Sequence, residues 1–118
     1  MNAAASVVIV VVALLHLYFL VLEMFLWDKP LGRRVFRLSP EFATASKALA
    51  ANQGLYNGFL AAGLVYALSL GDAGRPVKFL FLAFVIVAGI FGALTVNRRV
   101  FWIQSAPAAL AFLLLCLS

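Results

Sequence analysis

The sequence is poor in charge. Only 11% of its 118 residues are Asp, Glu, Lys or Arg, whereas 66% are hydrophobic. A typical soluble domain carries about 25% charged residues. A soluble fold of this length would leave much of its apolar surface facing water, whereas lipid would accept that surface. The composition therefore predicts an integral membrane protein.

Cysteine is also scarce, because Cys116 is the only one in the sequence. A single cysteine excludes an intrachain disulfide, a CxxC redox motif and the Cys/His spacing of a zinc site. The sequence contains no phosphate-binding glycine loop, internal repeat or low-complexity tract. We therefore expect neither a metal nor a cofactor.

The basic residues outnumber the acidic ones, which gives a net charge of +5. Such a balance can indicate a nucleic-acid partner. Here, however, the Lys and Arg residues occupy short segments between apolar runs, where they usually determine membrane topology. We expect the chain to contact membrane lipid, and we expect no nucleic-acid partner.

Four long apolar runs are present, at about 3–27, 49–70, 77–96 and 101–117. A helix needs about 20 residues to cross a hydrocarbon core of about 30 Å. The first run is too long for a signal-peptide core and should remain in the mature protein. The last is short and contains Pro107. The expected fold is an all-α bundle of four transmembrane helices, roughly 3–27, 40–70, 76–96 and 101–117, in a single domain over residues 1–118.

The second helix is expected to begin before its apolar run. Ser39 supplies a hydroxyl N-cap, Pro40 suits the first helical position, and Glu41 places a carboxylate in the first turn. The early turns of this helix, including Lys47, would lie at the membrane surface or in water.

The basic residues predict the orientation of the bundle. The first and third connections and the adjoining helix ends hold Lys29, Arg33, Arg34, Arg37, Lys47, Arg98 and Arg99, whereas the second holds only Arg75 and Lys78. By the positive-inside rule the first and third connections face the cytoplasm and both termini face out. Trp27 and Trp102 then fall at the cytoplasmic interface. The expected location is the bacterial cytoplasmic (inner) membrane, with several crossings.

Two ionisable residues lie within the first apolar run. His16 and Glu23 are seven residues apart, so they share a helix face at a separation of about 10 Å along the axis. Ionisable groups at membrane depth usually point into the bundle. They are either an acid/base or proton-handling pair, or a structural hydrogen-bonding histidine and an interfacial glutamate. The sequence leaves both alternatives open.

The second helix carries a dense polar cluster consisting of Asn52, Gln53, Tyr56 and Asn57. Gly54 and Gly58 form a GxxxG motif that Ala62 extends, and Gly92 marks a similar packing face on the third helix. The polar side chains either line a ligand or water cavity or form a structural network. We expect Glu23, Asn52, Gln53, Tyr56 and Asn57 to line a ligand site, with His16 at its base.

The strings HLYFLVLEMFLW (16–27) and ANQGLYNGFLAAG (51–63) resemble a bacterial family of small membrane proteins, one of the domain-of-unknown-function classes. The similarity extends to SPEFA (39–43) and FGALT (91–95) and covers nearly the whole chain. The resemblance implies a four-helix inner-membrane protein and no particular activity.

The leading functional hypothesis is a cytoplasm-facing intramembrane pocket that binds a small, largely apolar ligand. One alternative is a membrane enzyme that uses Glu23 or His16 as acid/base on a lipophilic substrate. Another is a small-solute or proton transporter. It would be a homo-oligomer, by default a dimer, built on the GxxxG face. A third is a structural accessory subunit whose polar residues hold helices together.

Overall fold

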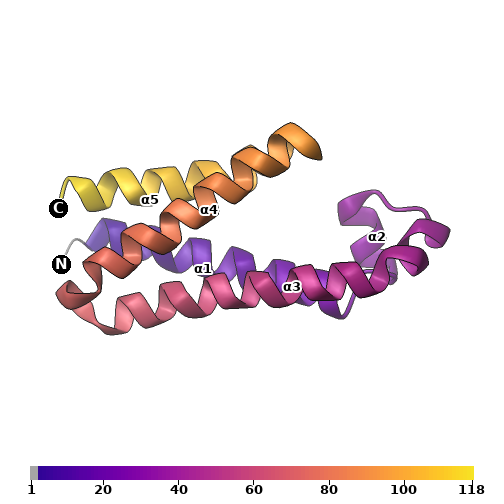
Figure 1. Ribbon diagram of the computed structural model, residues 1–118, viewed down its shortest axis with the longest axis horizontal. Helices are drawn as coiled ribbons and strands as arrows, with labels where there is room; N and C mark the ends of the chain where they lie inside the picture. The colour runs from indigo at the N-terminus through magenta and orange to yellow at the C-terminus, as the bar shows by residue number, and fades with distance from the viewer. Residues whose placement is uncertain (1–2) are drawn as a thin grey trace. The chain divides into compact units, whose positions relative to one another are not determined.

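The computed structural model describes residues 3–118, and these residues form helices and connections without a strand. The elements in chain order are α1 (Ala3–Met24), α2 (Pro30–Phe36), α3 (Pro40–Ser69), η1 (Gly71–Gly74), α4 (Arg75–Thr95), η2 (Phe101–Ser105) and α5 (Ala106–Cys116), of which Figure 1 labels α1 to α5. The expected all-α class is confirmed.

Two segments of the described chain are long and apolar enough to cross a membrane. They are Ala3–Met24 and Gly71–Thr95, whereas Phe101–Cys116 is apolar but shorter. This finding rests on length and composition, which buried helices of soluble proteins and signal sequences can share. α3 is the longest helix, but the amides of Asn52, Gln53 and Asn57 lower its hydropathy.

The first connection differs from the expectation, because it contains a helix. α1 ends at Met24 rather than Trp27, and α2 follows with Pro30 at its start. Proline favours the first turn of a helix because it needs no N–H partner there. α2 ends at Phe36, and Arg37 caps it with a left-handed φ of 56°. The N–H of Leu38 bonds to the carbonyl of Arg33 over 2.8 Å. Seven residues are too few to leave a periodic pattern in the sequence.

α3 begins where its capping sequence predicts. The Ser39 hydroxyl accepts a hydrogen bond from the backbone N–H of Phe42 over 3.2 Å. Pro40 is the first residue of the helix, and Glu41 lies in its first turn. The predicted start of the second helix is therefore confirmed, well before its apolar stretch.

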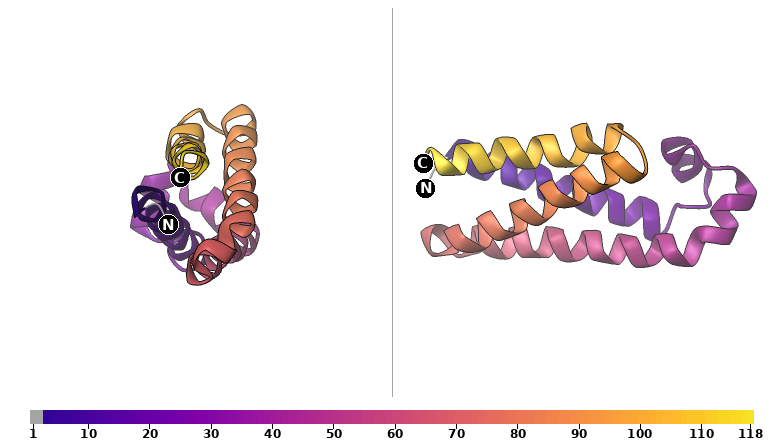
Figure 2. Two further views of the ribbon diagram at one scale, coloured as in Figure 1. Left: turned by 90° about the vertical axis from the view of Figure 1, so that its left-hand side faces the viewer. Right: turned by 45° about the horizontal axis from the view of Figure 1, so that its top comes forward.

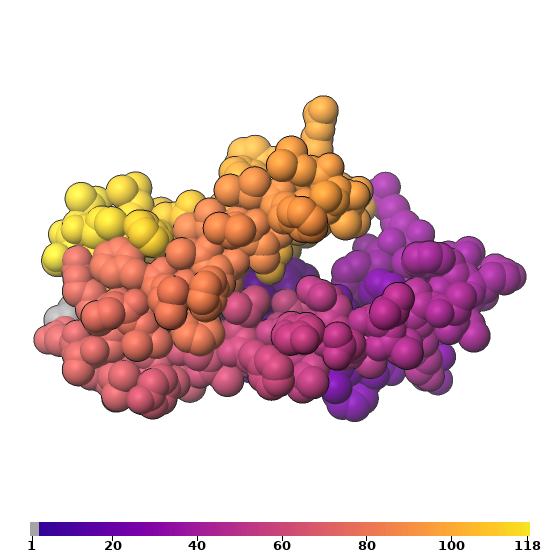
Figure 3. All heavy atoms as spheres, in the orientation of Figure 1, coloured from indigo at the N-terminus to yellow at the C-terminus, as the bar shows by residue number. Residues whose placement is uncertain are grey.

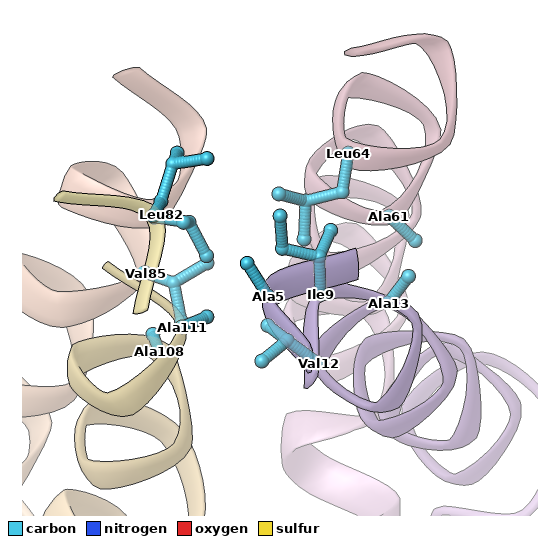
Figure 4. Close-up of a cluster of buried hydrophobic side chains, with 11 residues drawn as sticks. Ala5, Ile9, Val12, Ala13, Ala61, Leu64, Leu82, Val85, Ala108 and Ala111 are labelled. Carbon is cyan, nitrogen blue, oxygen red and sulfur yellow. The ribbon is translucent and has the colours of Figure 1, made fainter. Parts of the chain in front are cut away.

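The chain forms two compact units, one of residues 15–59 and one of residues 1–14 and 60–118. The second unit has an apolar core, which Figure 4 shows in close-up. Leu82 and Val85 of α4, with Ala108 and Ala111 of α5, face side chains from the beginning of α1 and the end of α3. Those side chains are Ala5, Ile9, Val12, Ala13, Ala61 and Leu64. This core therefore buries apolar side chains at the beginning of α1 and at the end of α3.

α4 and the last helix form an antiparallel pair in this unit, which the right-hand view of Figure 2 shows. Ser105 donates a hydrogen bond to the carbonyl of Ile86 over 2.7 Å. A Cβ on Gly89 would lie 2.1 Å from the Ser105 Oγ atom, so this contact requires glycine. The expected start of the last helix was Phe101, whereas helical residues already begin at Arg99, and Phe101–Ser105 wind as a π-helix. Pro107 is the second residue of α5 and has no N–H to donate to that turn.

Candidate functional site

The candidate site lies in the unit of residues 15–59, where α1 and α3 are joined by a hydrogen bond between side chains. The Asn57 Nδ2 atom donates to the Glu23 Oε1 atom. Glu23 is the penultimate residue of α1, and Asn57 lies beyond the middle of α3. Asn57 is buried and Glu23 is half-buried. The structure therefore brings together two residues that are 34 positions apart in the sequence.

The glycines of α3 allow this bond, because they let the two helices approach closely. A Cβ on Gly54 would lie 2.7 Å from Met24 Cγ and 3.2 Å from the carbonyl oxygen of Leu20. A Cβ on Gly58 would lie 2.6 Å from the Leu20 Cδ1 atom. The GxxxG face of α3 is thus occupied by α1 of the same chain. Ala62 is exposed, and Gly92 lies against Val100.

The Glu23–Asn57 pair retains free hydrogen-bonding capacity. A carboxyl group offers two oxygens and an amide one carbonyl oxygen. Within the part of the chain that the structure describes, Glu23 Oε2 and Asn57 Oδ1 have no hydrogen-bond partner, and neither is an enclosed atom. Two acceptors are therefore accessible beside the one bond already formed.

His16 is fully buried on α1 and is not part of this bond. Its ring meets the edge of Phe19, with 5.7 Å between centroids. Because α1 is continuous from Ala3 to Met24, the Cα atoms of His16 and Glu23 are about 10 Å apart along its axis. Direct proton transfer needs about 3 Å between heavy atoms. A single ligand could therefore contact both residues only at two separate points along its length.

The residues of the predicted polar cluster of α3 differ in exposure. Asn52, Gln53 and Tyr56 are exposed, whereas Asn57 is buried. Asn52 lies about 140° around the helix from Asn57. None of the three exposed side chains has a hydrogen-bond partner within residues 3–118. Their predicted role in ligand binding stays a prediction.

A second set of contacts ties the end of α1 to α3 and was not predicted. The Trp27 indole N–H donates to the Ser46 hydroxyl over 2.9 Å, and Lys47 Nζ lies 3.1 Å from Asp28 Oδ2. The hydrogen bond from Lys47 lowers the pKa of Asp28 below its usual value. Phe36 of α2 packs on Trp27, with 4.9 Å between ring centroids. The only signal in the sequence is the aromatic and charged composition of these segments.

The described residues contain no group of three or more His, Cys, Asp or Glu side chains that could hold a metal ion. The groups present at the site are the carboxyl group of Glu23 and the amide of Asn57. Such groups accept and donate hydrogen bonds.

Comparisons with known proteins agree with the family resemblance of the sequence. Residues 10–116 match a family described as "Protein of unknown function (DUF1304)". The chain is also 31% identical over 115 residues to "Uncharacterized protein YpaA" of Lactococcus lactis subsp. lactis (strain IL1403), covering 96% of this chain and 97% of that relative. No solved structure matches the chain. With the match spanning nearly all of its length, the chain belongs to the DUF1304 family.

Proposed function

We propose that the chain is a multi-pass protein of the bacterial cytoplasmic membrane. The segments that cross the membrane are α1, α3, α4 and the stretch from η2 to α5. α1 and the η1–α4 segment have the required length and hydropathy. α3 supports a third crossing because it is continuous over 30 residues, about 45 Å. The short last helix completes a bundle with both termini outside.

The contacts at the end of α1 support a cytoplasmic interface at Trp27. Indoles favour the boundary between lipid and water. The hydrogen bond from Trp27 places Ser46 of α3 at the same level, and the adjacent Lys47–Asp28 ion pair suits the headgroup region. The part of α3 beyond Ser46 then enters the membrane, and the part before it, with α2, lies at the cytoplasmic surface.

This topology predicts which positions an impermeant thiol reagent can reach. In a Cys116→Ser background, a cysteine in place of exposed Ala73 of η1 should react in intact cells. A cysteine in place of exposed Thr44 of α3 should react only after the cells are permeabilised. Labelling of Thr44→Cys in intact cells, or failure of Ala73→Cys to react under either condition, would contradict the proposed orientation.

We further propose that the Glu23–Asn57 pair binds a small, largely apolar molecule that carries a hydrogen-bond donor. The observation that carries this proposal is the bond between Asn57 and Glu23, with an accessible acceptor left on each side chain. Acyl chains offer no hydrogen-bond donor, so an acceptor at membrane depth stays unsatisfied until another molecule supplies one. A hydroxyl or amide N–H of a ligand would supply the missing donor.

The surroundings of the pair explain why the ligand should be apolar elsewhere. The α1 side chains that lie against the glycines of α3 beside the pair are apolar, namely Met24 at Gly54 and Leu20 at Gly58. A molecule that dissolves in lipid reaches such a site from the membrane. The site would distinguish an alcohol from a hydrocarbon of equal length because only the alcohol donates a hydrogen bond.

A photoactivatable analogue of hexadecanol tests this proposal in proteoliposomes. Hexadecanol should compete with labelling about tenfold better than hexadecane, since one hydrogen bond is worth about 1.4 kcal/mol or more at a carboxyl acceptor. Glu23→Leu/Asn57→Leu should remove this preference because it removes both acceptors, whereas Glu23→Gln should keep much of it because the amide oxygen still accepts. Equal competition by the two compounds, or a preference that survives Glu23→Leu/Asn57→Leu, would exclude this site.

A further inference from the structure

α3 carries an exposed seam of regular spacing on the side turned away from α1. The seam consists of Phe42, Ala45, Leu49, Asn52, Tyr56 and Phe59, all exposed. Successive members are alternately three and four residues apart, which is the spacing of the a and d positions of a coiled coil. Leu49, with 76% of its surface accessible, is the most exposed large hydrophobic residue of the seam. Figure 3 shows side chains of the α3 segment on the molecular surface.

The seam is distinct from the face by which α3 meets α1. Gly54 and Asn57 are buried on the α1 side, together with Ala43 and Ala50. Their mean direction is about 140° around the helix from the seam, at 100° for each residue. The GxxxG motif is therefore occupied by α1, whereas the seam is available to bind a second helix.

Asn52 lies in the middle of the membrane-facing part of the seam and has no hydrogen-bond partner within residues 3–118. It lies six residues beyond Ser46, about 9 Å deeper along the helix axis than the level of Trp27. Acyl chains cannot bond to an amide, so an amide at this depth requires a partner. A primary amide is its own complement because it contains both a donor and an acceptor.

We propose that this seam binds the same seam of a second copy, forming a parallel homodimer in which the two Asn52 amides hydrogen-bond to each other. The proposal rests on the membrane topology given above, which orients all copies alike and makes the two α3 helices parallel. A twofold axis along the membrane normal then brings each seam residue opposite its equivalent. One buried Asn in an apolar seam fixes register and favours a defined oligomer.

The arrangement also assigns a place to Gln53 and the aromatic rings. Gln53 follows Asn52 at a position that flanks such a seam and can bond across the dimer. Tyr56 and Phe59 meet edge to face, with 5.8 Å between their centroids. Their 54% exposure gives each ring surface for packing against the other copy.

Disulfide crosslinking in native membranes tests the dimer. In a Cys116→Ser background, Leu49→Cys and Phe59→Cys should form dimers under mild oxidation, because equivalent seam residues lie within disulfide range of each other. Thr44→Cys is the matched control, since Thr44 is exposed on α3 but outside the seam. Adding Asn52→Leu to Phe59→Cys should lower the association constant about tenfold.

Three outcomes would overturn the proposal. One is crosslinking of Leu49→Cys and Phe59→Cys no faster than that of Thr44→Cys. Another is a dimer that Asn52→Leu leaves unchanged. The third is a crosslink within one chain in Leu49→Cys/Phe91→Cys that replaces the dimer, which would assign the seam to α4 of the same copy. Carbonate extraction of the same membranes tests the proposed membrane location separately. Release of the protein by carbonate would contradict the membrane location, whereas an embedded protein that forms no dimer would contradict only the seam.

Discussion

Replacing Gly54 by valine should separate α1 from α3 and lower the free energy of unfolding by about 3 kcal/mol, the upper part of the range for an overpacked interface. A Cβ at this position already lies 2.7 Å from Met24 Cγ and 3.1 Å from Glu23 Cβ. The carbonyl oxygen of Leu20 is 3.2 Å away and belongs to the backbone of α1, which cannot rotate aside as a side chain can. The two methyl groups of valine increase the overlap.

The measurement is unfolding of the purified protein in mixed micelles, followed by circular dichroism. Ala62→Val is the matched control, because Ala62 continues the same small-residue stripe but is exposed. It should change stability by less than about 0.5 kcal/mol. Equal stabilities of Gly54→Val and Ala62→Val would mean that α1 does not lie against the GxxxG motif.

Local signals in the sequence predict the start of α3 and the polar character of the helix pair. Ser39, Pro40 and Glu41 form a start signal whose physics is contained within one turn, so the prediction needs no knowledge of the tertiary structure. The expectation that Glu23 turns toward the amides of α3 follows from the cost of placing a carboxyl group in lipid. Within residues 3–118, the structure pairs Glu23 with Asn57.

The division of the polar cluster could not be predicted from composition. Asn52 and Asn57 have the same side chain, and both lie beside small residues. Which of them faces α1 depends on the crossing of two helices, a tertiary property that the spacing of one helix does not contain. The contact of Trp27 with Ser46 was missed for the same reason. α2 was missed because its seven residues form less than two and a half turns and begin at a proline that also suits a turn.

Replacing Asn57 by leucine should lower the free energy of unfolding by about 2 kcal/mol, because it removes the donor to Glu23 and leaves a half-buried carboxyl group without its partner. Leucine is close to asparagine in size, so packing against α1 changes little. Asn52→Leu is the matched control on the same helix. In dilute micelles, where the chain is monomeric, the exposed Asn52 side chain contributes almost nothing to stability.

Loss of stability in Asn57→Leu alone could also arise from altered packing. A second substitution removes this ambiguity. If the amide acts through Glu23, replacing Asn57 should cost much less in a protein that already has leucine at position 23. An equal cost in both backgrounds would assign the effect of Asn57 to packing against other parts of α1.

The most direct test of the interhelical pair is therefore a double-mutant cycle of Glu23→Leu and Asn57→Leu, with unfolding free energies measured in the same micelles. The bond seen between Asn57 and Glu23 predicts a coupling energy of about 1 kcal/mol, within the range found for hydrogen bonds between membrane helices. Additive effects, agreeing within about 0.3 kcal/mol, would contradict the pair and the ligand site built on it.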